Sequence, residues 1–143
     1  MGGASGAAAP VADDSRIKPG ERLWRLIEIG WYQPGLQSTR SVQEAAFIGE
    51  VSLLREALVN ERIVDAVKNG KFAKYGIAQL NADEIRGQAG CFLRITADAD
   101  WPADAHVLII RKSGGKNLRI THPEVLALTM LANSKSLVRE PQP

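Results

Sequence analysis

The last third of the chain constrains the fold most strongly, because short strand-like segments follow one another there in quick succession. Segments 91–96 and 106–112 are rich in apolar and β-branched residues, and segment 117–120 follows a Ser-Gly-Gly turn at 113–115. Glycine accepts the positive φ of a tight hairpin, so this turn predicts an antiparallel return. No regular alternation of strands with long crossover helices is visible. We therefore predict an α+β fold with a small antiparallel, meander-type sheet of four to five strands packed by three to four helices.

Helices are predicted where a capping residue precedes an apolar pattern. Ser41 with Glu44, and Thr121 with Glu124, have the capping-box spacing, in which each side chain satisfies an orphan backbone N–H. Apolar residues then recur at spacings of 4, 3 and 4, which predicts a helix over 41–59; they are Phe47, Val51, Leu54 and Leu58. Further helices are expected after Asn60, over 82–89 and over 122–133. The last of these is apolar nearly all round and is expected to be buried at the centre.

The bulky segment 23–32 is interpreted as a strand, although a helix is the competing interpretation for a short apolar run. Alternation puts Arg25 and Trp31 on one face and Trp24 on the other. Both tryptophans are covered by packing within the domain, or one of them lies at an interface. A shorter strand is expected over 75–80.

Composition and the termini indicate one domain. Residues 1–15 are small and polar and are expected to be a disordered tail, residues 137–143 a short C-terminal tail, and residues 16–136 a single α+β domain. No secretory signal and no bilayer-length apolar run is present in the sequence. With one cysteine and no export signal, we expect a cytoplasmic protein that does not contact a membrane.

Few residues in the sequence have the chemistry of a metal site. The chain has one cysteine and two histidines, which excludes an internal disulfide framework and a zinc site of several cysteines. Asp98, Asp100 and Asp104 form an acidic loop, but Pro102 and Ala103 occupy positions where a calcium loop requires a different pattern. We expect neither a metal nor a cofactor.

The strongest candidate site is a basic hairpin, in which four cations and no carboxylate lie within nine residues. Its charged and turn residues would bind an anionic partner or form an interface; they are Arg111, Lys112, Gly114, Gly115, Lys116 and Arg119. The same charges would also keep an exposed hairpin from pairing at its edge. The hairpin is therefore either a contact surface or a solvated turn.

No catalytic motif is present in the sequence. Cys91, His106 and His122 are the candidate nucleophile and bases, but each is also explained as a structural residue. We expect a non-catalytic interaction module (an adaptor, inhibitor or regulator) that binds a protein partner through its sheet and hairpin. The alternative is a nucleic-acid-binding protein that uses segment 111–119. A small enzyme built on His122, His106 or Cys91 is the weaker alternative, and the oligomeric state is left open.

Overall fold

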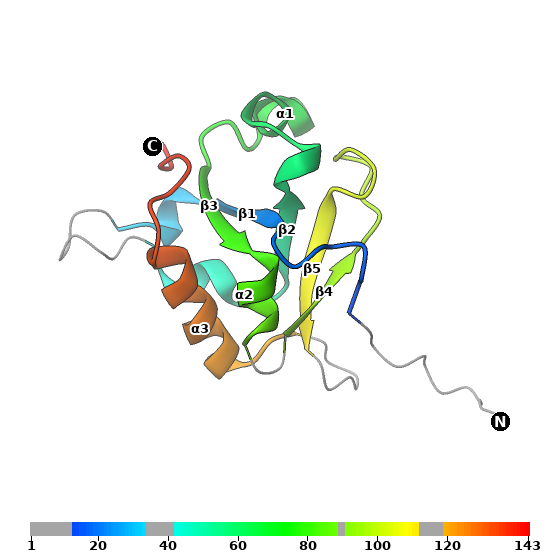
Figure 1. The fold of residues 1–143 in the computed structure, drawn as a ribbon. Coiled ribbons are helices and arrows are strands. Elements are labelled where there is room, and N and C mark those ends of the chain that lie inside the picture. Colours follow the sequence, from blue (N-terminus) through cyan, green and yellow to red (C-terminus); the bar gives the residue numbers. More distant parts are fainter. Residues whose placement is uncertain (1–12, 34–41, 89–90, 112–118) are drawn as a thin grey trace.

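The protein folds around one five-stranded antiparallel sheet, seen in a computed structural model that describes residues 13–33, 42–88, 91–111 and 119–143. The strands follow the order β3-β1-β2-β5-β4 (Figure 1). Their bounds are β1 Arg22–Ile27, β2 Val51–Arg55, β3 Gly76–Asn81, β4 Cys91–Ile95 and β5 His106–Arg111. This arrangement confirms the predicted α+β class.

Three α-helices and four 3-10 turns connect or cover the strands in the described residues. The helices are α1 Glu61–Ala66, α2 Ala82–Arg86 and α3 His122–Asn133. The 3-10 turns are η1 Ile29–Trp31, η2 Glu44–Phe47, η3 Glu56–Leu58 and η4 Val67–Gly70. Asn60 caps α1 through its side chain, which accepts a hydrogen bond from the Ile63 N–H at 3.0 Å.

The predicted helix over 41–59 is wrong. The structure has η2, the strand β2 and η3 in its place, with a glycine of positive φ, Gly49 at 86°, between η2 and β2. β2 lies in the middle of the sheet, and Leu53 and Leu54 are both buried although they point to opposite faces, so the segment contains a short apolar run. Such a run gives no alternating pattern and can match helical spacing by chance. Leu58, the fourth residue of the supposed helical face, is 37% exposed.

For the C-terminal half of the chain, the elements predicted from the sequence agree better with the structure. Predicted strands over 75–80, 91–96 and 106–112 correspond to β3, β4 and β5. β4 and β5 pair directly, and β5 then continues the sheet to β2. The expected return strand falls mostly on residues outside the described ranges, and its last residues, Arg119 and Ile120, are not in a strand. At the other end of the chain, β1 is shorter than predicted because the segment after Ile27 turns into η1.

Helix α3 has the predicted bounds and capping box. The Glu124 carboxylate accepts hydrogen bonds from the Thr121 N–H at 2.8 Å and the Thr121 hydroxyl at 2.7 Å. It is not a buried central helix, however, since Leu126 is 40% and Met130 74% exposed. It lies against the sheet on one side (Figure 1) and buries only the stripe around Leu128.

The sheet has two unequal faces. The inner face is fully covered and includes Leu23, Leu53 and Val107, which belong to the larger hydrophobic cluster with residues of η2, α2 and α3. The outer face includes Trp24 and Leu54, which pack with Val64 of α1 in a smaller cluster. Because α1 covers only one end of the outer face (Figure 1), part of this face is left for a site.

Both edges of the sheet are covered by the chain's own terminal segments. At the β3 edge, the Ile77 N–H donates to the Arg139 carbonyl at 2.9 Å and the Val138 N–H to the Ile77 carbonyl at 2.8 Å. At the β4 edge, the Leu93 N–H donates to the Asp13 carboxylate at 2.8 Å. The segment expected as a C-terminal tail is thus bound to the sheet, and the bound N-terminal segment begins before residue 15. Among the described helices, none is long and apolar enough to cross a membrane.

We expect Leu128→Ala to lower the free energy of unfolding by about 2–5 kcal/mol, because it leaves a cavity under α3. Met130→Ala on the same helix is the matched control and should change it by less than about 0.5 kcal/mol. Urea unfolding followed by circular dichroism measures both. Equal effects of the two variants would contradict the packing of α3 described above.

We expect Gly76→Ala to destabilise the protein by about 1–3 kcal/mol, because the new methyl group would overpack the contact between β3 and the C-terminal segment. A Cβ at this position would lie 2.6 Å from Pro141 Cδ and 2.7 Å from Pro141 N. Gly20→Ala, where a Cβ meets no atom within 4 Å, is the control. Thermal unfolding of the two variants compares them, and an unchanged Tm for Gly76→Ala would show that the C-terminal segment is not held at β3.

Candidate ligand-binding site

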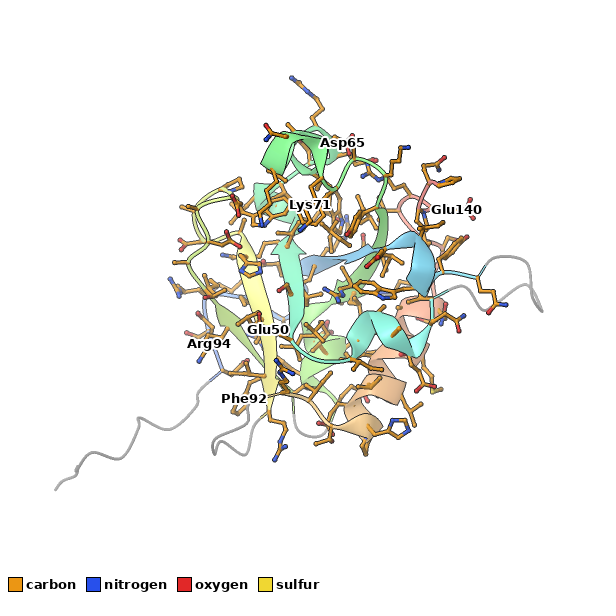
Figure 2. All side chains as sticks on the ribbon, turned by 180° about the vertical axis from the view of Figure 1, so that it is seen from behind. Glu50, Asp65, Lys71, Phe92, Arg94 and Glu140 are labelled. Atoms are coloured by element: carbon orange, nitrogen blue, oxygen red, sulfur yellow. The ribbon has the colours of Figure 1, made fainter. Side chains whose placement is uncertain are left out.

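A pocket of about 340 Å³ lies on the outer face of the sheet, beside the region that α1 covers. Side chains from β1, β2 and β5 line it together with η1, η4 and the loops before β3 and β5. Figure 2 views the molecule from behind and labels Glu50, which immediately precedes β2 and lines the pocket. The lining residues are Arg25, Leu26, Trp31, Glu50, Ser52, Leu54, Lys68, Phe72, Tyr75, Asp98, Trp101 and His106.

Arg25 lies where β1 and β2 separate. These two strands pair at only two positions, Leu23 with Arg55 and Trp24 with Leu54, whereas β1 pairs with β3 along its whole length. Past that point the Arg25 guanidinium takes the place of a strand partner: its Nη1 donates to the Ser52 carbonyl at 3.1 Å. Its Nε donates to the Ala46 carbonyl at 2.8 Å. Arg25 therefore joins η2, β1 and β2 at the pocket wall.

The charge of Arg25 has no carboxylate partner in the described part of the chain. All sixteen Asp and Glu residues lie in that part. The side chain is only 9% exposed, and burial lowers its pKa to about 10, so it is still a cation at neutral pH. A buried charge without a counterion is costly. An anion in the pocket would offset that cost.

Aromatic side chains form the rest of the wall. Arg25 lies over the Trp31 ring, with its Cζ 5.1 Å from the ring centroid. Phe72 contacts Tyr75 edge-to-face at 4.9 Å and Trp101 at 5.7 Å between centroids. Such surfaces bind flat apolar groups by stacking and edge contacts. The pocket thus combines one buried cation with an aromatic enclosure.

Arg139 of the C-terminal segment fixes the loop that carries two of these rings. Its Nε donates to the Tyr75 carbonyl at 2.8 Å and its Nη2 to the Phe72 carbonyl at 3.1 Å. It also forms an ion pair with Asp65 of α1 at 2.8 Å. The C-terminal segment therefore positions the aromatic wall as well as covering the β3 edge.

His106 faces the pocket from the first position of β5, opposite Leu54 of β2. Its Nδ1 is buried without a hydrogen-bond partner and lies 3.7 Å from Asp98 Oδ2, just beyond hydrogen-bonding distance. Burial lowers the pKa of the ring below its usual value, while Asp98 and Glu50 act in the opposite direction. The imidazole is accordingly neutral at neutral pH and can accept a proton when a further negative charge arrives.

The other charged groups of the pocket lie closer to solvent. Lys68 is 42% exposed and pairs with Asp100 at 3.1 Å, so Asp100 already compensates much of its charge. Glu50 is exposed and forms no ion pair within the described ranges. Its carboxylate opposes an incoming anion, which makes it a useful probe of the charge that the pocket accepts.

The basic hairpin predicted from the sequence stays a prediction. Lys112, Gly114, Gly115 and Lys116 lie outside the described residues, while Arg111 ends β5 and Arg119 is exposed. Arg111 and His106 are at opposite ends of β5, about 17 Å apart at about 3.4 Å per residue. Arg111, the first residue of the predicted hairpin, is therefore separate from the pocket.

The three candidate catalytic residues are not brought together. Cys91 is buried in β4 opposite Arg111, and His106 lies at the far end of β5. His122 is exposed at the start of α3. Of the three, only His106 lines the pocket.

The acidic loop is held by contacts with two basic residues. Asp98 faces His106 and Asp100 pairs with Lys68, and no group of three metal-ligating side chains occurs among the described residues. Trp24 is buried in the outer cluster, whereas Trp31 is half-buried at the pocket.

Sequence reasoning missed Arg25 as a site residue, although an arginine within a bulky apolar strand was the signal for it.

Comparison of the chain with known protein families, curated proteins and solved structures finds no match. The functional argument therefore rests on the chemistry of the pocket.

We expect His106→Gln to reduce the loss of stability on acidification. The pKa of His106 is lower in the folded protein than in the unfolded chain, so the unfolded state binds the proton first. Stability from this group is therefore present above the unfolded pKa and falls as the pH drops through about 6.5 toward the folded value. Urea unfolding at pH 7.5 and 5.5 measures the difference, with His122→Gln as the matched control that should keep the wild-type pH dependence. A wild-type pH dependence in His106→Gln would contradict the burial of this ring.

Proposed function

We propose that this protein binds a small organic anion with an aromatic body in the pocket on the outer face of the sheet. The observation that carries the proposal is Arg25, a cation that is nine-tenths buried, lines the pocket and has no carboxylate partner in the described chain. The guanidinium binds the anionic group, since its planar fork suits carboxylates, phosphates and sulfonates.

The remaining lining supports an aromatic ligand. Rings of Trp31, Phe72, Tyr75 and Trp101 surround a volume of about 340 Å³, which is in the range of small-molecule sites. Apolar walls with a few polar groups that fix orientation are typical of such sites. The ligand's ring packs against these walls, and its charge determines its orientation toward Arg25.

This proposal keeps the non-catalytic binding role expected from the sequence but changes the ligand. A protein partner that adds a strand to the sheet is disfavoured, because the terminal segments already occupy hydrogen-bonding groups at both edges. A protein or nucleic-acid partner at the basic hairpin is supported only by the local charge of segment 111–119. The pocket offers a defined cation, walls and volume, so we favour it.

The test uses benzenesulfonate, with methyl phenyl sulfone as the neutral probe of nearly the same shape. In ¹H-¹⁵N spectra we expect benzenesulfonate to shift the indole N–H signals of Trp31 and Trp101 saturably, and the sulfone to shift them little. Trp24, which is buried outside the pocket lining, is the internal reference. Equal binding of both probes, or a shift as large at Trp24 as at Trp31 and Trp101, would contradict an anion site at Arg25.

Variants of the charged residues provide an independent test. Arg25→Gln should weaken benzenesulfonate binding by about tenfold or more, because it removes a charge-assisted contact. Glu50→Gln, at an exposed rim position, should strengthen binding by about two- to threefold by removing a repulsive charge. Asp83→Asn changes charge equally at an exposed position of α2 outside the pocket lining and should leave the affinity unchanged. Should Arg25→Gln fail to fold, equal affinities of Glu50→Gln and Asp83→Asn would still refute the proposal.

A further inference from the structure

We propose that the ligand of this pocket carries two separated negative charges on its aromatic body, one bound by Arg25 and the other by His106, which takes up a proton as the ligand binds. This inference rests on the proposed function and deepens it, since it specifies the charge and geometry of the ligand. It also makes ligand binding dependent on pH.

The positions of the two groups favour two separate anionic groups over one. Arg25 approaches β2 from β1 and contacts the Ser52 carbonyl, whereas His106 belongs to β5 on the other side of β2. At the last paired row, Trp24, Leu54 and His106 lie side by side on β1, β2 and β5, so the backbones of β1 and β5 are about 10 Å apart there at about 4.8 Å per strand. An aromatic ring with an anionic substituent at two positions spans such a distance, with the ring over β2. Ser52 and Leu54 of β2 form the floor on which this ring would lie.

The imidazole has the capacity for this second contact. Its Nδ1 is buried without a hydrogen bond and faces Asp98 at 3.7 Å, so the contact with a ligand falls to Nε2, the other nitrogen of the ring. The other charged or titratable groups that line the pocket around it are Arg25 of β1, Glu50 before β2, Lys68 of η4 and Tyr75 before β3. Arg25 and Lys68 are cations before a ligand arrives, and Lys68 is already paired with Asp100. His106 is therefore the basic group of the lining that can gain a positive charge.

The direction of the pH effect follows from burial. The unliganded ring is neutral at neutral pH because burial disfavours its charged form. A ligand anion in contact with the ring favours the imidazolium, as Asp98 and Glu50 do more weakly in the unliganded protein. Ligand binding therefore raises the affinity of His106 for a proton, and by reciprocity a lower pH raises the affinity for the ligand.

The experiment compares benzene-1,3-disulfonate with benzenesulfonate by isothermal titration calorimetry at pH 7.5 and 5.5. Neither probe titrates in this range, so any pH dependence belongs to the protein. Bis-tris and imidazole buffers are used because their protonation enthalpies differ and neither is an anion that competes for the pocket. We expect the disulfonate to bind about threefold or more tightly at pH 5.5 than at 7.5, with proton uptake of up to about one per ligand. Benzenesulfonate should show a smaller effect.

The variants separate this inference from the proposed function. His106→Gln should remove the proton uptake and bring the affinity for the disulfonate close to that for benzenesulfonate, while binding at Arg25 persists. His122→Gln is the matched control and should behave like the wild type. On the wild-type protein, NMR titration of the imidazole signals should show the pKa of His106 rising when the disulfonate is added, which needs no variant.

Each outcome has a defined meaning. If benzenesulfonate binds through Arg25 but the disulfonate binds no more tightly and takes up no proton, the inference is wrong and the proposed function stands. The inference is also overturned if the pH dependence persists in His106→Gln. If neither probe binds, the proposed function fails and the inference fails with it.

Discussion

The contact between Arg25 and the carbonyls of Ser52 and Ala46 is the interaction on which the site depends. β1 and β2 pair at only two positions, and the guanidinium occupies the place where their ladder would continue. The gap allows η1 and η2 to approach the sheet, and it leaves a cation at the wall of a pocket. A continuous β1–β2 ladder would satisfy the backbone without any charge. The structure instead uses a buried charge, which carries a cost that an apolar residue would not.

The terminal segments complete the domain by covering the edges of the sheet. The N-terminal aspartates accept hydrogen bonds from β4, and Asp13 also pairs with Arg86 at 2.7 Å. The C-terminal segment lies along β3 and, through Arg139, holds the loop of Phe72 and Tyr75. Exposed sheet edges are sites of unwanted strand pairing, so covering them protects the domain from association. The C-terminal segment also positions the aromatic wall of the pocket, which links stability at the β3 edge to the candidate site.

The charges around the pocket are graded by depth. Arg25 is buried, His106 is half-buried and Lys68 is exposed. Electrostatic interactions strengthen as water is excluded, so Arg25 and His106 would influence the proposed ligand more than Lys68 at the rim would. Arg25 and His106 also differ in how they titrate. The arginine stays charged near neutral pH, whereas the histidine gains or loses its charge as its surroundings change.

The sequence by itself determined the elements whose signals are local. The Thr121–Glu124 capping box specified the start of α3, because both partners lie within one turn. Short strands bounded by turn residues likewise predicted β3, β4 and β5, and with them the α+β class. Tertiary structure alone decided what depends on distant neighbours. β2 is a strand because it is enclosed by β1, β5 and helices, although its apolar spacing also fits a helix. Arg25 and His106, eighty-one residues apart in the sequence, line one pocket only because β1 and β5 both flank β2.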